Sequence, residues 1–345
     1  MIIIMRAENL MGIKNDIQLK EFNNVVSEVL QLVSKNNEWV SRYHEYAKII
    51  MQNLDEIKQA RSSFREWAPL KFYLNVSNAK KASNYLSLGV RYIGQEVAEL
   101  IFDKSKSNTP LLNTKKYNVK KAKYFDWHKS LNMVDWRGKE AKEFRAYFKK
   151  HPQRIEITSK RNEEHRIESL LLSEFSKQQS TGKALKYIQP VKIGGIRFPM
   201  PTPISASYHK SVKYSKAYGG GIDIFARVGK SGSSAKLCVI ELKDENNPKE
   251  PAIDVVKQAV AYAAFIRELL RSESGNDWWK LFGFSKQIPK KITILAACAM
   301  PSDKGNDYSF ANKEIQVGGD IISLHYIYFQ EKDNQIIRID SSLNQ

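Results

Sequence analysis

Residues 219–243 read GGGIDIFARVGKSGSSAKLCVIELK, and this stretch decides the fold. It contains two short apolar runs, residues 222–226 and residues 237–242, which are rich in residues that favour strands and too short for helices. The Gly- and Ser-rich segment between them, residues 229–234, predicts a loop that joins two antiparallel strands.

The two predicted strands carry a pair of carboxylates and a lysine. Because side chains alternate between the faces of a strand, Glu241 and Lys243 point to the same side. Antiparallel pairing would bring Asp223 beside Glu241. Two carboxylates in an apolar setting repel each other and raise their own pKa values unless a cation lies between them. Oxygen ligands of this kind suit Mg²⁺, with Mn²⁺ as a substitute.

Lys243 can assist chemistry at such a centre by orienting a water, helping its deprotonation or stabilising the transition state. The same Glu-x-Lys spacing recurs at residues 56–58 and 140–142, but in helical patterns, where it is typical of a solvated face. A salt bridge at the end of the strand is the alternative interpretation for Glu241 and Lys243.

A third motif follows in a helical run over residues 252–271, where Gln258 and Tyr262 are four residues apart and share one face. In this order, Gly221-Ile222-Asp223, Glu241-Leu242-Lys243 and Gln258 with Tyr262 resemble the three motifs of the PD-(D/E)XK nuclease superfamily, in its RecB-type form. The proline that often precedes the aspartate in this superfamily is Ile222 here. The resemblance covers about residues 160–330.

The resemblance implies a role for each of these residues. Asp223 and Glu241 would bind the metal, the Leu242 carbonyl would be a backbone ligand, and Lys243 would be catalytic. Gln258 and Tyr262 would support the site or contact the DNA strand. In this superfamily the helix before the core strands often adds an acidic residue. We expect that helix over residues 162–177 and predict that Glu168 is this acidic residue. Glu164 and His165 are the alternatives for the role. The remaining interpretation is that the two glutamates are solvated and have no role at the site.

The order of elements from residue 162 agrees with this family. After the helix come strands over residues 187–193, 222–226 and 237–242, the helix over 252–271, and strands over 291–300 and 321–329. The prediction is an α/β (α+β) fold: a C-terminal restriction-endonuclease-like αβββαβ core with a central mixed sheet, preceded by a helical-plus-β N-terminal domain.

The N-terminal part predicts two helices over residues 17–33 and about 37–59, arranged as an antiparallel hairpin, and two strands over 85–92 and 97–102 around a turn at Gly94. Residues 101–150 then hold fourteen Lys and Arg against five Asp and Glu. Aromatic residues interleave with these charges, at Tyr117, Tyr124, Phe125, Trp127 and Trp136. Phosphate contact with base stacking is one interpretation, and a solvated loop around a small core is the other. His151-Pro152 marks the expected boundary between domains 1–150 and 151–345.

Composition narrows the partners and the compartment. The 345 residues carry a formal net charge of +18, which favours a polyanion such as nucleic acid. The two cysteines, Cys238 and Cys298, lie in apolar runs and predict buried free thiols in a reducing cytoplasm. No run approaches the roughly 20 apolar residues of a membrane span.

The sequence as a whole predicts a Mg²⁺-dependent DNA endonuclease or exonuclease, of a stand-alone restriction, defence or repair type, that hydrolyses phosphodiester bonds. One alternative is a non-catalytic nucleic-acid-binding protein on a nuclease-like scaffold. Another is a partner-binding protein that forms a homodimer through its N-terminal helices.

Overall fold

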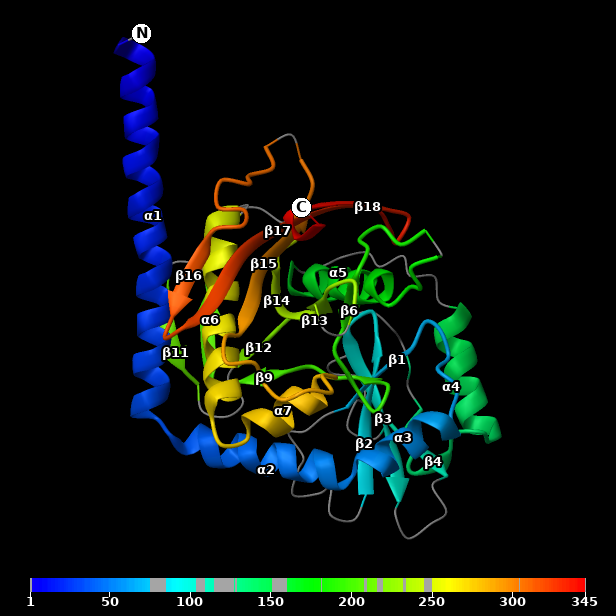
Figure 1. Cartoon of the computed structure of the whole chain (residues 1–345). Helices are drawn as coiled ribbons and strands as arrows, with labels where there is room; N and C mark the ends of the chain where they lie inside the picture. Colours follow the sequence, from blue (N-terminus) through cyan, green and yellow to red (C-terminus); the bar gives the residue numbers. More distant parts are fainter. Residues whose placement is uncertain are drawn as a thin grey trace.

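The computed structural model describes residues 2–74, 85–103, 109–114, 127, 129–150, 160–180, 182–207, 210–215, 220–231, 234–244, 250–303 and 305–344. They form a mixed α/β structure with two larger sheets and helices packed around them, consistent with the predicted α+β class (Figure 1). No helix in these ranges is both long and apolar enough to cross a membrane.

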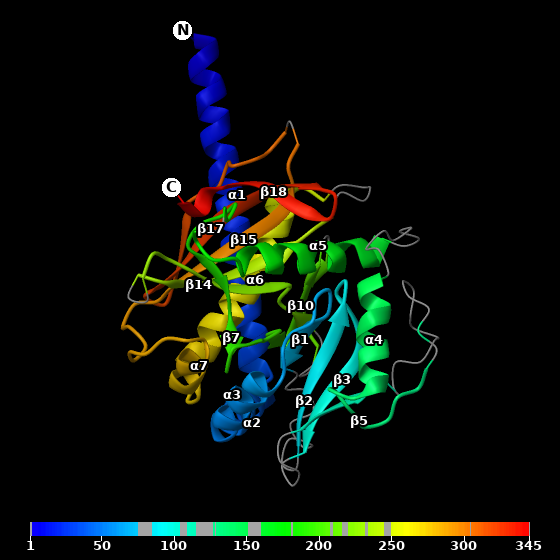
Figure 2. The same ribbon diagram turned by 90° about the vertical axis from the view of Figure 1, so that its right-hand side faces the viewer.

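The first sheet is built mainly from the N-terminal part of the chain. Its order is β5-β4-β3-β2-β1-β8-β7, and only the β1–β8 pair is parallel. The strands are β1 (Lys71–Leu74), β2 (Tyr85–Tyr92), β3 (Gln95–Asp103), β4 (Pro110–Asn113), β5 (Val134–Asp135), β7 (Lys192–Ile193) and β8 (Ile196–Arg197). The helix α4 (Lys139–Lys150) lies beside this sheet (Figure 2). The predicted strands around Gly94 are confirmed as β2 and β3.

The second sheet contains the segment that decides the fold. Its order is β16-β17-β15-β14-β13-β6, with β18 also paired to β17; the pairs β14–β15 and β15–β17 are parallel and the others antiparallel. The strands are β6 (Ile188–Pro190), β13 (Ile224–Val228), β14 (Lys236–Leu242), β15 (Thr293–Pro301), β16 (Glu314–Val317), β17 (Asp320–Lys332) and β18 (Gln335–Ser341). Helices α5 (Lys160–Phe175) and α6 (Ala252–Arg271) confirm the two predicted helices.

Alternation along β14 explains why both faces of this sheet are covered. Leu237 and Val239 belong to the hydrophobic cluster that contains the buried side of α6, whereas Cys238, Ile240 and Leu242 belong to the cluster that contains α5. The strand is therefore a near-continuous apolar run, as expected for a strand covered on both faces. Both cysteines are buried and free.

The single strand predicted over residues 187–193 is wrong, because the chain changes sheets within it. β6 pairs with β13 in the second sheet, and β7 turns back through Gly194 and Gly195 to pair with β8 in the first. Both glycines have positive φ, +57° and +83°, which this tight turn requires. Apolar alternation continues through both pieces, so the pattern alone does not reveal the switch.

The shorter elements complete the fold. β9 (Pro201–Thr202) pairs with β12 (Gly220–Gly221), and β10 (Ile204–Ser207) pairs with β11 (Lys210–Tyr214). The helix α7 (Gly275–Leu281) follows α6, and the 3₁₀ helix η4 (Ser342–Asn344) ends the described chain.

The predicted N-terminal helical hairpin is wrong. α1 (Ile2–Lys35) runs along α6, whereas α2 (Glu38–Gln52) turns away from α1 and packs against α7, and α3 (Leu54–Ser63) continues toward the first sheet (Figure 1). The apolar stripe of α2 explains this arrangement, because the rings of Trp39 and Tyr43 both contact Phe265 of α6. The indole N–H of Trp278 in α7 also donates to the Tyr43 carbonyl at 3.1 Å. These stripes are buried within the chain's own core.

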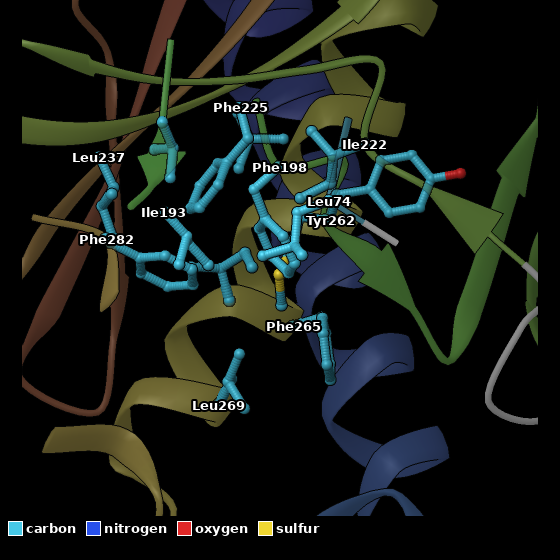
Figure 3. Packing of buried hydrophobic residues seen from close by; sticks show 14 of the residues in the cluster. Leu74, Ile193, Phe198, Ile222, Phe225, Leu237, Tyr262, Phe265, Leu269 and Phe282 are labelled. Atoms are coloured by element: carbon cyan, nitrogen blue, oxygen red, sulfur yellow. The ribbon is translucent and has the colours of Figure 1, made fainter. Parts of the chain in front are cut away.

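One hydrophobic cluster extends across residue 150. Leu74 of β1 and Ile193 of β7 belong to the same cluster as Tyr262, Phe265 and Leu269 of α6 (Figure 3). The division into domains 1–150 and 151–345 stays a prediction. However, β7 and β8 follow residue 150 and belong to the first sheet, whereas α1 precedes it and packs along α6.

Part of the basic, aromatic segment lies outside the described residues, including Tyr117, Tyr124 and Phe125. Two of its aromatics are described. Trp127 packs edge-on against Phe144, with ring centroids 5.2 Å apart, and Trp136 is buried against Phe72. Trp136 is thus part of a hydrophobic core, and Trp127 is half-buried and packs against it.

A glycine turn ties the first sheet to α5. Gly94, between β2 and β3, has a φ of +74°, and a Cβ there would lie 2.5 Å from the His165 carbonyl oxygen. Gly94→Ala is therefore expected to lower the free energy of unfolding by about 2 kcal/mol, through both backbone strain and the clash. Urea denaturation measures the change.

The matched control for that substitution is Gly182→Ala. Gly182 also has a positive φ, +67°, but nothing lies within 4 Å of the position of its added Cβ. Its substitution should cost about 1 kcal/mol or less, from strain alone. Equal losses in the two variants would mean that the contact between Gly94 and α5 contributes nothing.

Candidate active site

The predicted pairing of the two carboxylate-bearing segments is confirmed. β13 and β14 are antiparallel, with Ile224 opposite Ile240, so Asp223 lies opposite Glu241 one position further along. The Leu242 backbone N–H donates to Asp223 Oδ2 at 2.8 Å. Since the N–H and C=O of one strand residue point to the same side, the Leu242 carbonyl also faces the Asp223 side. Lys243 donates its backbone N–H to the opposite side, to the Ala299 carbonyl of β15 at 3.0 Å.

Both carboxyl groups are held in a poorly solvated place at the end of β14. Glu241 is 6% exposed, and burial raises its pKa to about 7 even though Lys243 opposes the shift. Burial also raises the pKa of Asp223 well above its usual value, and the charges of Glu241 and Glu164 raise it further. Such a pair is destabilising when both groups are ionised, unless a cation lies close to them.

Lys243 is the cation that the described chain itself supplies. Its Nζ lies 2.9 Å from Glu241 Oε1, and its side chain is 19% exposed. Burial alone would lower the pKa of Lys243, but Glu241 and Glu164, and then Asp223, outweigh burial and raise it above its usual value. These carboxyl groups therefore favour the protonated ammonium, which donates hydrogen bonds.

The helix α5 brings both of its candidate glutamates to this end of the sheet. Burial raises the pKa of Glu164, with Lys243 and His165 opposing the shift. Glu164 in turn raises the pKa of both Asp223 and Glu241. Glu168, the residue predicted from the sequence, is 9% exposed, and its Oε2 lies 3.3 Å from Nδ1 of His165. Its influence on Asp223 is weaker than that of Glu164.

Gln258 and Tyr262, four residues apart on α6, each make a hydrogen bond to a neighbouring segment. Gln258 Nε2 donates to Glu250 Oε1 at 2.5 Å. The Tyr262 hydroxyl accepts the Ala206 N–H of β10 at 3.2 Å. Burial raises the pKa of Tyr262, and the Glu241 charge is the next cause, so the hydroxyl lies within electrostatic reach of the carboxylates.

Glu250 is the site residue that sequence reasoning missed. Burial raises its pKa, while Lys243 and the hydrogen bond from Gln258 oppose the shift. It belongs to no motif and follows the breaker at residues 246–248. The sequence feature that could have indicated it is its position two residues before the start of α6, from which a carboxylate can reach back toward the end of β14.

The donor chemistry of the site fits a hard divalent cation. Four carboxyl groups, those of Asp223, Glu241, Glu164 and Glu250, interact electrostatically with the single ammonium of Lys243. Carboxylate and carbonyl oxygens are the ligands that Mg²⁺ and Mn²⁺ prefer. Within the ranges given for the structure, no three His, Cys, Asp or Glu side chains are already close enough together to hold a metal ion.

The main chemical feature of the candidate active site is the excess of carboxyl groups over ammonium groups at the carboxyl end of β14, where Glu241 is buried and Asp223, Glu164 and Glu250 are half-buried. Comparison with protein-family models, with curated proteins and with solved structures found no match to this chain.

Proposed function

We propose that this chain is a Mg²⁺-dependent nuclease that hydrolyses phosphodiester bonds in DNA. The observation that carries the proposal is the pairing of Asp223 with Glu241 beside Lys243 at the end of β14, where Glu241 is buried and Asp223 is half-buried. Their mutual repulsion is relieved by a divalent cation, and this set of three side chains is the one that the PD-(D/E)XK resemblance implies. The sequence of α5, β6, β13, β14, α6 and β15 supports a restriction-endonuclease-like core.

Asp223, Glu241 and the Leu242 carbonyl are the proposed metal ligands. Glu164 is the better third carboxylate by its electrostatic coupling to both acids, and Glu168 remains the one predicted from the resemblance. A bound Mg²⁺ would polarise the scissile phosphate and make a bound water more acidic. Mn²⁺ is the expected substitute.

Lys243 has a defined role in this proposal. Because its pKa is raised, it acts as a charged hydrogen-bond donor that orients the attacking water and offsets charge on the phosphate oxygens. Gln258 fixes Glu250, and Tyr262 fixes β10, so α6 holds the surroundings of the carboxylates in place. The reaction would be direct hydrolysis, without a covalent enzyme intermediate.

DNA is the proposed substrate because the net charge of +18 favours a polyanion. The free, buried thiols of Cys238 and Cys298 agree with a reducing compartment such as the cytoplasm. A restriction, defence or repair role is the one we propose for a nuclease core with its own additional sheet.

The deciding experiment measures nicking and degradation of supercoiled, linear and single-stranded DNA, with RNA as a further arm, in Mg²⁺, Mn²⁺ and EDTA. We expect metal-dependent cleavage by the wild type and a loss of about 10³-fold or more in Asp223→Ala. Asp55→Ala is the control, because Asp55 lies on α3 with a side chain 93% exposed. Cleavage that persists in EDTA or in Asp223→Ala contradicts the proposal.

A further inference from the structure

Four cations from separate elements gather around the carboxylate of Glu66, which lies in the connection between α3 and β1. Glu66 pairs with Arg197 of β8, with Nη1 3.5 Å from Oε2, and with Arg61 of α3 at 3.9 Å. Its charge also acts on Lys71 of β1 and Lys192 of β7. We call Arg61, Lys71, Lys192 and Arg197, with Glu66, the basic cluster.

Strand register places the strand members of this cluster on one face. Arg197 lies opposite both Tyr73 of β1 and Lys192 of β7. Residues directly opposite each other in a sheet share a face, and so do residues two apart in a strand, which adds Lys71. Phe72 and Leu74 alternate with them and belong to the main hydrophobic core. The cations therefore share the face of the first sheet that is turned away from this core.

The basic cluster adjoins the candidate active site. A cavity of about 20 Å³ is lined by Tyr73 and Arg197 from the first sheet together with Glu168 and Asp223. The turn at Gly94 also contacts α5 directly. Figure 2 shows this side, with α5 lying across the ends of β1 and β2.

The basic cluster holds four basic side chains against one carboxylate, that of Glu66. Arg197 is 7% exposed, and its Nε is buried without a hydrogen-bond partner among the residues that the structure describes. Burial lowers the pKa of both Lys71 and Lys192, and the charge of Arg197 lowers each further, against the opposing effect of Glu66. A guanidinium in this situation favours an anionic acceptor, above all a phosphate.

We propose that the basic cluster binds backbone phosphates of the nucleic acid strand beside the scissile bond, an inference that rests on the proposed function. Lys192 is exposed and Lys71 half-buried, so both ammonium groups can reach a strand that lies over β1 and β7. Arg197 lines the same cavity as Asp223, so the bound phosphates would lie next to the carboxylates of the candidate active site. The first sheet thus grips the substrate, and the end of β14 acts on it.

The test measures binding of labelled duplex and single-stranded DNA by fluorescence anisotropy in EDTA, where binding is separated from cleavage. Lys192→Ala should weaken binding about three- to tenfold and make the salt dependence less steep by about one counterion. Lys71→Met with Lys192→Ala should weaken binding about 10- to 100-fold. Arg197→Lys, which keeps the charge but loses the planar fork, should weaken it about tenfold.

Two further variants separate phosphate binding from a purely structural cluster. Glu66→Gln removes the only acid of the cluster and should tighten binding about threefold, which a structural role does not predict. Lys313→Ala is the control, because Lys313 is exposed near β16 at the far edge of the second sheet and should leave affinity within about twofold. Thermal melts identify any variant that fails to fold. If Arg197→Lys fails to fold, Lys192→Ala still decides the test, because Lys192 is exposed.

The outcomes for the cluster and for the nuclease are distinguishable. Weakened binding in the cluster variants supports the phosphate site even when the wild type cuts none of the substrates. The opposite outcome can also be recognised. If the wild type cleaves DNA with a metal ion, but Lys192→Ala and the Lys71 double variant bind DNA as tightly as Lys313→Ala does, the phosphate site is overturned and the nuclease proposal stands.

Discussion

Lys243→Met is expected to lower the single-turnover rate of DNA cleavage by about 10³-fold while changing DNA affinity by no more than about twofold. The reason is the position of the ammonium, 2.9 Å from Glu241 and within the influence of Asp223 and Glu164. In the proposed mechanism it contacts the reacting phosphate there and adds little to the binding of a long strand. Single-turnover cleavage at saturating enzyme measures the rate, and anisotropy in EDTA measures the affinity.

Lys257→Met is the matched control for this variant. Lys257 is also a half-buried lysine that pairs with carboxylates, since its Nζ lies 3.1 Å from Asp254 Oδ1 and its side chain is 23% exposed, against 19% for Lys243. It lies near the start of α6 and contacts Glu21 of α1, so its loss should affect stability and not the rate. A similar loss of rate in both variants, or none in Lys243→Met, contradicts the assigned role.

Local patterns were sufficient to predict the elements that form the candidate site. The helix α6 begins and ends at the residues predicted, 252 and 271, because its apolar period is long and breakers precede it. The pairing of Asp223 with Glu241 followed from two short apolar runs and the loop between them. Short connections leave few possible arrangements, so register could be predicted without any tertiary information.

Features that depend on distant packing could not be predicted in this way. The apolar stripes of two successive helices do not tell which partner each helix packs against, and in the structure the rings of α2 contact Phe265 of α6 and Trp278 of α7. Glu250 reaches the site because of where α6 begins relative to the strand ends. The position of Arg197 beside Tyr73 and Lys192 depends on β8 joining the first sheet, which the alternation of residues 188–197 does not encode.

The acids of the site predict a gain of stability on neutralisation. Burial raises the pKa of Glu241 from 4.5 to about 7, which corresponds to about 3 kcal/mol at 1.36 kcal/mol per pKa unit. Because the folded state holds the proton more tightly than the unfolded state, ionisation destabilises the fold. The cost is absent below pH 4.5, grows between pH 4.5 and about 7, and is complete above that range.

Glu241→Gln, which mimics the protonated acid, should therefore raise the free energy of unfolding by about 3 kcal/mol at pH 8 in EDTA and change it little at pH 4.5. Urea denaturation at both pH values measures the difference. Mg²⁺ should narrow the difference at pH 8, because the ion stabilises the wild type more than a variant that lacks one ligand. A difference that is the same at both pH values, or unaffected by Mg²⁺, contradicts the proposed metal site.

Asp320→Asn provides the contrast, since a buried acid that is already matched by cations should behave in the opposite way. Asp320 is 2% exposed and accepts hydrogen bonds from Nε of Arg267 at 2.8 Å and of Arg271 at 2.9 Å. Burial opposes the shift, but Arg271, the Ile292 N–H and Arg267 together lower its pKa.

The charge of Asp320 therefore stabilises the fold at neutral pH, and that contribution is lost only as the pH falls through the lowered pKa. Neutralising it should cost about 2 kcal/mol at pH 8, because the partly exposed guanidinium groups of Arg267 and Arg271 lose their shared carboxylate. Opposite signs for Glu241→Gln and Asp320→Asn at pH 8 would show that the charge of Glu241 destabilises the fold, as the proposed metal site requires, whereas the charge of Asp320 is matched by arginines.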